Sequence, residues 1–462
     1  MRTIIKNGTI VTAVGTYPGD ILIEGEKISA IGLAFPAEQT DKIIDAAGKY
    51  VLPGAVDVHT HLDAPQMGTV TADDFESGTT AAAWGGTTTI VDFATQPRGG
   101  SLLQGYETWH RKAAGKAVID YGFPMVIRQL NEQVLPEMDL LVRDEGVSSF
   151  KLYMSYPGDL MVGDAEIFRI LQRSGENGGL VCMHAENGDV IDLIVKKALA
   201  EGKIAPKYHA LTRPTKAEAE ATHRAIALAE MVGVPVYIVH LSCADALEEV
   251  RDARQLGLPV YAETCPHYLF LSIEEYDRPG FEGAKYVMTP PLREKWHQDV
   301  LWKGLAGRDV SVISTDHCPF CIREQKEIGL NDFSLIPNGA PGIESRLMLV
   351  YDGGVRQGRI TLNRMVELLS TNPARLMGLY PRKGTIAPGS DADLVIFDPE
   401  AKLVLSAKTH HTRVDYNLFE GREVTGVPIT VLSRGQTVIE DRVFVGKAGN
   451  GKYIKRDHYQ LV

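Results

Sequence analysis

The sequence predicts an α/β protein: a (β/α)8 barrel with a smaller β-sandwich domain built from both ends of the chain. Through the middle, apolar runs alternate with amphipathic helical stretches, which is typical of parallel βα units. Short β-rich runs separated by turns occupy the first fifty residues and return near the end. At 462 residues the chain is long enough for two domains. A doubly wound open sheet is the alternative for the middle.

The β-sandwich is expected to combine residues 1–52 with residues 379–445. Its first part has β-rich runs at 3–5, 9–11, 20–23 and 28–31. Its second part has runs at 392–397, 402–405 and 429–432, followed by a turn at 433–436. The tail, 446–462, is rich in Gly and Lys at its start, and we expect a flexible extension or a subunit contact.

The barrel is expected to span residues 53–378. Two segments, 215–231 and 244–255, carry apolar residues at helical spacing and should belong to its outer ring. Eight apolar runs fit the eight strands of a barrel. They are 51–59, 87–94, 119–127, 148–156, 180–186, 234–242, 258–263 and 310–316.

Composition narrows the classes of partner and location. The formal net charge of −11, with Lys and Arg scattered, opposes binding to nucleic acid and leaves a small uncharged substrate. The first residues lack the apolar core of a signal peptide, and no apolar stretch is long enough to span a membrane. Five cysteines favour reduced thiols over a disulfide framework. A cytoplasmic protein is therefore expected.

A candidate metal site begins at His59-Thr60-His61. Side chains two apart on a strand point to one face, so both imidazoles should project inward from the end of the first barrel strand. Alone, such a pair is more often structural. Four more residues stand near the ends of other predicted strands: Lys151, His184, His240 and Asp316.

Barrel active sites lie at the carboxyl ends of the strands, so these six residues should converge there. Each has a structural alternative, such as a core histidine, a helix cap or a buried ion pair, but their joint placement favours metal binding. Imidazole and carboxylate ligands suit zinc, with manganese, cobalt or nickel as replacements. Cys318 and Cys321 have Cys-x-x-Cys spacing, but loop packing is favoured over a structural zinc or redox role.

Lys151 is the unusual member of this set, because an ammonium beside two dications would be repelled. Reaction of its amine with carbon dioxide gives a carbamate, an anion whose two oxygens can bridge two metals. We therefore expect Lys151 to be carboxylated, as N6-carboxylysine.

At this point the sequence resembles the amidohydrolase superfamily, and within it the cyclic amidases called hydantoinases and dihydropyrimidinases. The resemblance covers nearly the whole chain. Its blocks are PGAVDVHTHL (53–62), SFKLYMSY (149–156), VCMHAE (181–186), VHLS (239–242), ETCPHYL (263–269), PPLR (290–293), STDHCP (314–319), IPNGAPG (336–342) and GSDADLV (389–395).

The resemblance implies two divalent metal ions. His59, His61, carboxylated Lys151 and Asp316 would hold one metal, and Lys151, His184 and His240 the other. A hydroxide bridging them would attack the scissile carbonyl. Asp316 would accept the hydroxide proton and return it to the leaving ring nitrogen. The resemblance also implies a homotetramer, with a homodimer as the alternative.

Three further residues match family positions that bind substrate. Tyr156 resembles the tyrosine whose hydroxyl stabilises the oxyanion, although a rim aromatic is the alternative. Thr289 and Asn338 would grip the cyclic amide largely through main-chain groups, and Thr289 replaces the serine usual in the family. Asp57 and Glu263 are candidates to support the ligand histidines, or are ordinary strand-end carboxylates.

The implied reaction is the opening of a hydantoin or dihydropyrimidine, a small cyclic ureide, to an N-carbamoyl amino acid. Allantoinase and dihydroorotase are alternatives, but the run after His61, Leu62-Asp63-Ala64-Pro65-Gln66, lacks the arginine usual in dihydroorotases. A non-catalytic dihydropyrimidinase-related protein is a second alternative, and such proteins lack metal ligands. Met67, Tyr153, Leu160 and Met161 could line an apolar substrate pocket.

Overall fold

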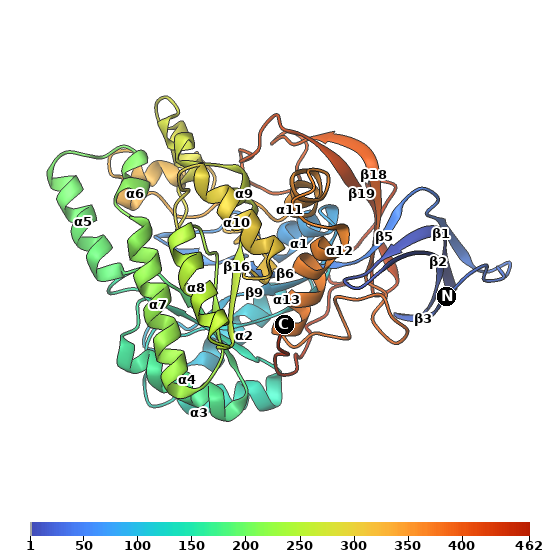
Figure 1. Cartoon of the computed structure of the whole chain (residues 1–462), viewed down its shortest axis with the longest axis horizontal. Helices are drawn as coiled ribbons and strands as arrows, with labels where there is room; N and C mark the ends of the chain where they lie inside the picture. Colours follow the sequence, from blue (N-terminus) through green and yellow to red (C-terminus); the bar gives the residue numbers. More distant parts are fainter. Residues whose placement is uncertain (1) are drawn as a thin grey trace.

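The computed structural model describes residues 2–462, which form a barrel with surrounding helices and a β-domain beside it. In Figure 1 the barrel occupies the left and centre, and strands from both chain ends, blue and red, lie together at the right. This arrangement confirms the predicted fold class.

The barrel strands run parallel, and each predicted apolar run overlaps one strand position. Because both faces are covered, these strands are almost entirely buried, including their polar residues. In chain order they are β6 (Ala55–Thr60), β9 (Thr87–Asp92) continued by β10 (Ala94–Thr95), β11 (Asp120–Gly122) continued by β12 (Met125–Val126), β13 (Ser149–Tyr153), β14 (Leu180–His184), β15 (Val236–Ile238), β16 (Val260–Thr264) and β17 (Val312–Ile313).

The barrel closes where the segment after β17 meets β6. The backbone N–H of His61 donates to the carbonyl of His317 at 2.9 Å, and Thr60 forms an isolated parallel bridge with His317. Closure therefore brings His61 beside Asp316, although 255 positions separate them in the chain.

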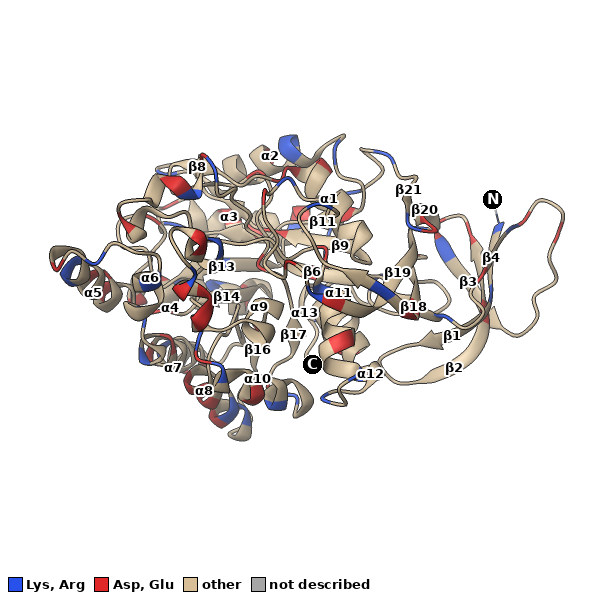
Figure 2. Cartoon of the chain, turned by 90° about the horizontal axis from the view of Figure 1, so that it is seen from above, with Lys and Arg blue, Asp and Glu red and all other residues tan. Residues whose placement is uncertain are grey.

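Helices cover the outside of the barrel. They are α1 (Phe75–Trp84), α2 (Leu102–Ala113), α3 (Val134–Leu140), α4 (Asp164–Asn177), α5 (Gly188–Ala200), α6 (Lys207–Leu211), α7 (Thr215–Val232), α8 (Ala244–Gln255), α9 (Pro266–Phe270), α10 (Trp296–Ala306), α11 (Arg346–Val350), α12 (Leu362–Val366) and α13 (Asn372–Leu376). The segment predicted at 244–255 is α8, and the one at 215–231 is α7 with one more residue. Figure 2 shows acidic and basic residues interspersed along α7 and α8.

The β-domain is one nine-stranded sheet shared by the two chain ends. Antiparallel pairing of β5 with β18 joins the two sets, and buried aliphatic residues from both ends form its core. The order is β21-β20-β19-β18-β5-β1-β2-β3, with β4 beside β1. The strands are β1 (Arg2–Val11), β2 (Thr16–Glu24), β3 (Lys27–Gly32), β4 (Lys42–Asp45), β5 (Tyr50–Pro53), β18 (Leu394–Val404), β19 (Glu423–Ser433), β20 (Gln436–Glu440) and β21 (Val443–Phe444).

A buried ion cluster connects the barrel to the β-domain. The ammonium of Lys383 lies 2.6 Å from Asp120 Oδ2 on β11, 2.6 Å from Asp393 Oδ2 and 3.0 Å from Asp391 Oδ2. Asp391 and Asp393 directly precede β18. The neighbouring carboxylates hold the pKa of Lys383 above its usual value despite burial.

The C-terminal tail is ordered, which corrects the expectation of a flexible extension. Its backbone N–H groups donate to barrel carbonyls, Gly451 to Ala117 at 2.8 Å and Ile454 to Tyr121 at 2.8 Å. Buried Arg456 donates to the carbonyl of Phe123 at 2.7 Å. The tail is held against the barrel because these carbonyls lie in or beside short strands and need hydrogen-bond donors.

Two further findings concern location. Within residues 2–462, no helix combines the length and the apolar character that crossing a bilayer requires. All five cysteines are unpaired.

Candidate metal centre and active site

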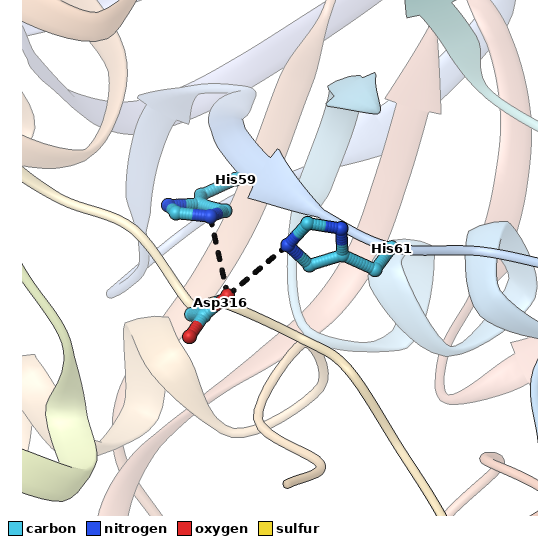
Figure 3. Close-up of side chains that lie close together, drawn as sticks. All are labelled: His59, His61 and Asp316. Atoms are coloured by element: carbon cyan, nitrogen blue, oxygen red, sulfur yellow. Dashed lines mark ion pairs between the residues drawn. The ribbon is translucent and has the colours of Figure 1, made fainter. Parts of the chain in front are cut away.

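Three predicted ligands meet at the carboxyl end of the barrel (Figure 3). Asp316 Oδ1 lies 3.2 Å from His59 Nε2 and 3.3 Å from His61 Nε2. His59 belongs to β6 and His61 follows it, so the two-residue period of the strand points both imidazoles inward. Ligand atoms of this trio lie within 4.8 Å of one another.

The other nitrogen of His59 is held by a buried carboxylate. Glu263, on β16, accepts a hydrogen bond from His59 Nδ1, and it also accepts one from the hydroxyl of Tyr237 at 2.7 Å. This contact fixes the tautomer and leaves Nε2 as the lone-pair nitrogen facing Asp316. Burial raises the pKa of Glu263 to about 7 and lowers the pKa of His59 well below its usual value. The suggestion that Glu263 supports a ligand histidine agrees with this contact.

Lys151 lies in the middle of β13, rather than at its end as the sequence suggested. Its Nζ is 3.4 Å from His59 Nε2 and lies 4.9 Å and 5.0 Å from the ring centroids of Phe93 and Tyr153. Among the described residues it forms no ion pair with a carboxylate within 4.0 Å. Burial lowers its pKa to about 8, which makes the amine more nucleophilic near neutral pH.

His184 and His240 form the second half of the site. His184 Nδ1 lies 2.8 Å from His240 Nε2, and Glu186 Oε2 lies 3.0 Å from the other nitrogen of His184. Two facing imidazole nitrogens cannot both be hydrogen-bond acceptors without a shared proton or a cation. His240 Nδ1 finds no partner within the described chain. The pair therefore presents nitrogen donors to the same cavity as Lys151.

The chemistry of the whole set fits divalent metal ions. Burial lowers the pKa of His59, His184 and His240, so these imidazoles are neutral and keep a lone pair. The nearby histidines hold the pKa of Asp316 well below its usual value, against burial, so it is an anion. Neutral imidazoles, a carboxylate and a lysine open to carboxylation are hard and borderline ligands that zinc and similar cations accept.

Contacts on both sides of Asp316 fix its position. The hydroxyl of Thr315 donates to Asp57 Oδ2 at 2.6 Å, and His317 Nε2 lies 3.1 Å from Asp73 Oδ2. Asp316 itself has φ +48°, an uncommon conformation for a residue other than glycine. Asp57 thus supports the strand-end backbone, and its carboxylate contacts no ligand imidazole, contrary to the role considered for it.

Five of the six candidate ligands, all except Lys151, line a pocket that encloses about 800 Å³ together with the open solvent at its mouth. All three predicted substrate-binding residues line it: Tyr156, Thr289 and Asn338. Asn338 Nδ2 donates to the hydroxyl of Tyr156 at 3.4 Å, while Asn338 Oδ1 is buried without a partner in the described chain. Burial raises the pKa of Tyr156 to about 12, so its hydroxyl keeps its proton at neutral pH.

The rim is only partly as expected. Met67, Tyr153 and Leu160 line the pocket, but Met161 does not; it pairs with Tyr153 through a backbone bridge. The hairpin of β7 (Pro65–Gln66) and β8 (Thr69–Val70) brings Met67 to the entrance.

Among the pocket residues that sequence reasoning missed are Arg128 and Cys318. Arg128 follows β12 and forms an ion pair with Asp159. Cys318 Sγ lies 3.4 Å from Gln66 Oε1, whereas Cys321 Sγ lies 3.6 Å from the carbonyl of Arg413. The two thiols thus have separate partners, as loop packing requires. The strand-end position of Arg128 was a signal that could have been used.

A parallel barrel with buried imidazoles and a carboxylate converging at its strand ends is the architecture of a metal-dependent hydrolase. The chain belongs to the amidohydrolase family, whose sequence model matches residues 50–438.

Comparisons with individual proteins cover the full chain. It is 53% identical over 459 residues to a D-hydantoinase from Geobacillus stearothermophilus, covering 99% of this chain and 97% of that one. A D-hydantoinase from Streptomyces coelicolor is 52% identical, with 98% of each covered. The crystal structure of a dihydropyrimidinase from Brevibacillus agri superimposes with a TM-score of 0.99 at 52% identity, covering 100% of both chains.

Proposed function

We propose that this protein is a binuclear metal-dependent cyclic amidohydrolase that opens hydantoins or dihydropyrimidines to N-carbamoyl amino acids. The observation that carries the proposal is that five of the six candidate ligands, contributed by several barrel strands or the residues that follow them, line one pocket, with Lys151 next to His59. Full-length similarity to proteins named D-hydantoinase and dihydropyrimidinase supports the choice of substrate class.

In this proposal Lys151 is carboxylated and shared by two metal sites. His59, His61 and Asp316 complete one site, and His184 and His240 complete the other. Zinc is the metal that suits these ligands best, with manganese, cobalt or nickel as alternatives. When bound, such ions make hydroxide available at neutral pH and polarise the carbonyl of the substrate.

The side chains of the chain supply the remaining chemistry. Asp316, an anion within reach of both His59 and His61, accepts the proton of the attacking water and returns it to the ring nitrogen as the amide bond breaks. The hydroxyl of Tyr156 donates to the oxygen that gains negative charge during attack. Thr289 and Asn338 hold the ring amide against the opposite wall.

The main alternatives, allantoinase and dihydroorotase, are less well supported. Dihydroorotate carries a carboxylate and calls for an unpaired cation in the pocket. Among the described pocket residues Arg128 is the only arginine, and its guanidinium is already paired with Asp159, which also pairs with Arg98. Allantoin is a neutral ureide, and the names of the full-length relatives favour hydantoin or dihydropyrimidine over it.

Steady-state rates with purified, zinc- or manganese-loaded protein test the proposal. Substrates should include hydantoin, dihydrouracil, substituted hydantoins of each hand, allantoin and dihydroorotate. We expect ring opening of hydantoins or dihydrouracil at rates well above those for the last two. Absence of bound metal and of activity on every ureide would instead support a non-catalytic relative.

We further propose that the protein is a cytoplasmic homotetramer, with a homodimer as the alternative. Exposed aliphatic residues such as Leu193 on α5 and Leu211 at the end of α6 offer surface that assembly would bury. The five unpaired cysteines favour a reducing compartment. Light scattering of the purified protein tests the assembly.

A further inference from the structure

Behind the wall of the pocket that faces the metal donors lies a buried lysine, Lys326. It begins a short 3-10 helix, Lys326–Gly329, in the chain between Asp316 and Asn338. Its side chain is completely buried. Its Nζ donates to the carbonyl of Val287 at 2.9 Å and to the carbonyl of Pro337 at 3.0 Å.

Lys326 has no counter-ion in the part of the chain that the structure describes. None of the ion pairs within 4.0 Å includes it, in contrast to buried Lys383, which is surrounded by three aspartates. Burying an amine in this way is costly, and two backbone carbonyls offset only part of that cost. The burial of such a lysine needs a local explanation. Here the explanation lies in which two backbone carbonyls its Nζ contacts.

Both carbonyls belong to the segments that carry the substrate-binding candidates. Val287 lies two residues before Thr289, and Pro337 directly precedes Asn338. The two segments are also joined directly, because the N–H of Gly339 donates to the same Val287 carbonyl at 3.0 Å. Lys326 and Gly339 therefore share one acceptor. The Nζ of Lys326 links the two loops a second time, beside the backbone hydrogen bond from Gly339.

The loop that carries Asn338 and Gly339 is also tightly packed, so a shift of this loop would disturb the hydrogen bonds made by Lys326. A Cβ added to Gly339 would lie 2.2 Å from the carbonyl oxygen of Cys318, another pocket residue. Asn338 N in turn contacts Met67 Sδ at 3.3 Å. The position of Asn338 is thus set by the bridge on one side and by the rim on the other.

We propose that Lys326 is a positioning residue for substrate binding: its buried amine, through two hydrogen bonds, holds the Thr289 and Asn338 segments at the separation that grips a cyclic amide. The inference rests on the proposed function for its choice of substrate. Lys326 touches neither the metal donors nor the pocket, so it acts through Thr289 and Asn338 and leaves the hydrolytic groups in place.

Arg456 provides a matched control. It is also a buried cation that donates to backbone, to the carbonyls of Phe123 and Met377, but it lies beside Ser149, at the start of β13 and away from the pocket. Lys326→Met and Arg456→Met should both lower the thermal unfolding midpoint. Only Lys326→Met should change the KM for substrate.

The experiment compares the two variants as zinc-loaded holoenzymes on hydantoin and dihydrouracil. Losing two hydrogen bonds that shape the binding wall should raise KM about tenfold in Lys326→Met, with kcat within about threefold and metal content unchanged. In Arg456→Met, KM should stay within about twofold. Lys326→Gln, a shorter side chain that keeps N–H donors, should fold readily and give an intermediate KM.

An unchanged KM in Lys326→Met or Lys326→Gln, or an equal rise in Arg456→Met, would overturn the proposal. Hydrogen exchange gives a reading that needs no turnover: the amide of Gly339 should exchange faster in both Lys326 variants and at the wild-type rate in Arg456→Met. If the wild-type protein hydrolyses no ureide, the proposed function fails, and the exchange rate of Gly339 alone decides whether Lys326 bridges the two loops.

Discussion

Glu263 and His59 form a buried pair across the barrel in which the carboxylate accepts a hydrogen bond from Nδ1–H and leaves Nε2 free for the site. Glu263→Gln keeps the shape of the side chain. Its amide is neutral, however, and cannot hold the His59 tautomer as the carboxylate does. We expect metal affinity to fall by about 10- to 100-fold. Competition with a chelator measures it. Tyr237→Phe, which removes another hydrogen bond to Glu263, is the control and should change affinity much less.

Lys151→Ala should remove both bound metal and activity, because the proposed bridge is lost. Short carboxylic acids such as acetate or propionate supply a carboxylate in the vacated space and should restore part of each. Metal analysis and hydantoin hydrolysis with and without the acid are the measurements. A mutant with full activity would exclude a bridging role for Lys151.

The pH dependence of carboxylation follows from the same residue. Only the neutral amine reacts with carbon dioxide, and burial lowers the pKa of Lys151 from 10.5 to about 8. In metal-free protein at a fixed concentration of dissolved carbon dioxide, carbamate should therefore increase as pH rises. The rise should be steeper below about pH 8 than above it, because forming the carbamate releases one proton and, below the pKa, the ammonium must lose another. Carbon-13 NMR with labelled carbon dioxide detects it. A signal that appears only near pH 10 would indicate an ordinary lysine.

Tyr156→Phe tests the oxyanion contact. Loss of one donor to the developing negative charge should lower kcat by about 10²- to 10³-fold, with metal content retained. Tyr453→Phe removes a hydroxyl that donates to the carbonyl of Glu145 outside the pocket and should leave kcat unchanged. Loss of metal in Tyr156→Phe would show that the assignment is wrong.

Removal of Lys383 from its ion cluster should lower the free energy of unfolding without acting directly on catalysis. In Lys383→Met, Asp120 keeps Arg434 and Asp391 keeps Lys27 and Arg382, but buried Asp393 loses the only side-chain cation within 4.0 Å of it among the described residues. This loss should cost about 3–5 kcal/mol of unfolding free energy at neutral pH. The loss should shrink as pH falls, because protonation removes the unpaired charge. Adding Asp393→Asn should recover part of it. Thermal unfolding across pH provides the measurement.

The candidate ligands other than Lys151 could be brought to one end of the barrel from sequence because they stand at or near the ends of strands, where a two-residue period and the direction of a parallel barrel fix their side. His59, His61 and Asp316 illustrate this: local pattern places each, and barrel closure brings them together. Lys151 was placed at the wrong point of its strand, since apolar runs mark strand ends poorly.

Other features depend on contacts between distant segments and leave little local pattern. Arg128 stands at a strand end, but its ion pair with Asp159 joins two separate segments and leaves no local pattern. The bridge made by Lys326 depends on two loops from different parts of the chain. Gly-rich composition suggested mobility for the tail, whereas its backbone donors meet carbonyls of the barrel.

The shared sheet has a consequence for how the chain is made. As the ribosome releases the first strands, β5 can pair with β1 but lacks its second partner until β18, more than three hundred residues later, has emerged. The sheet of the β-domain is therefore completed only after the barrel segment has been made, and until then the second edge of β5 is open to other strands or to chaperones.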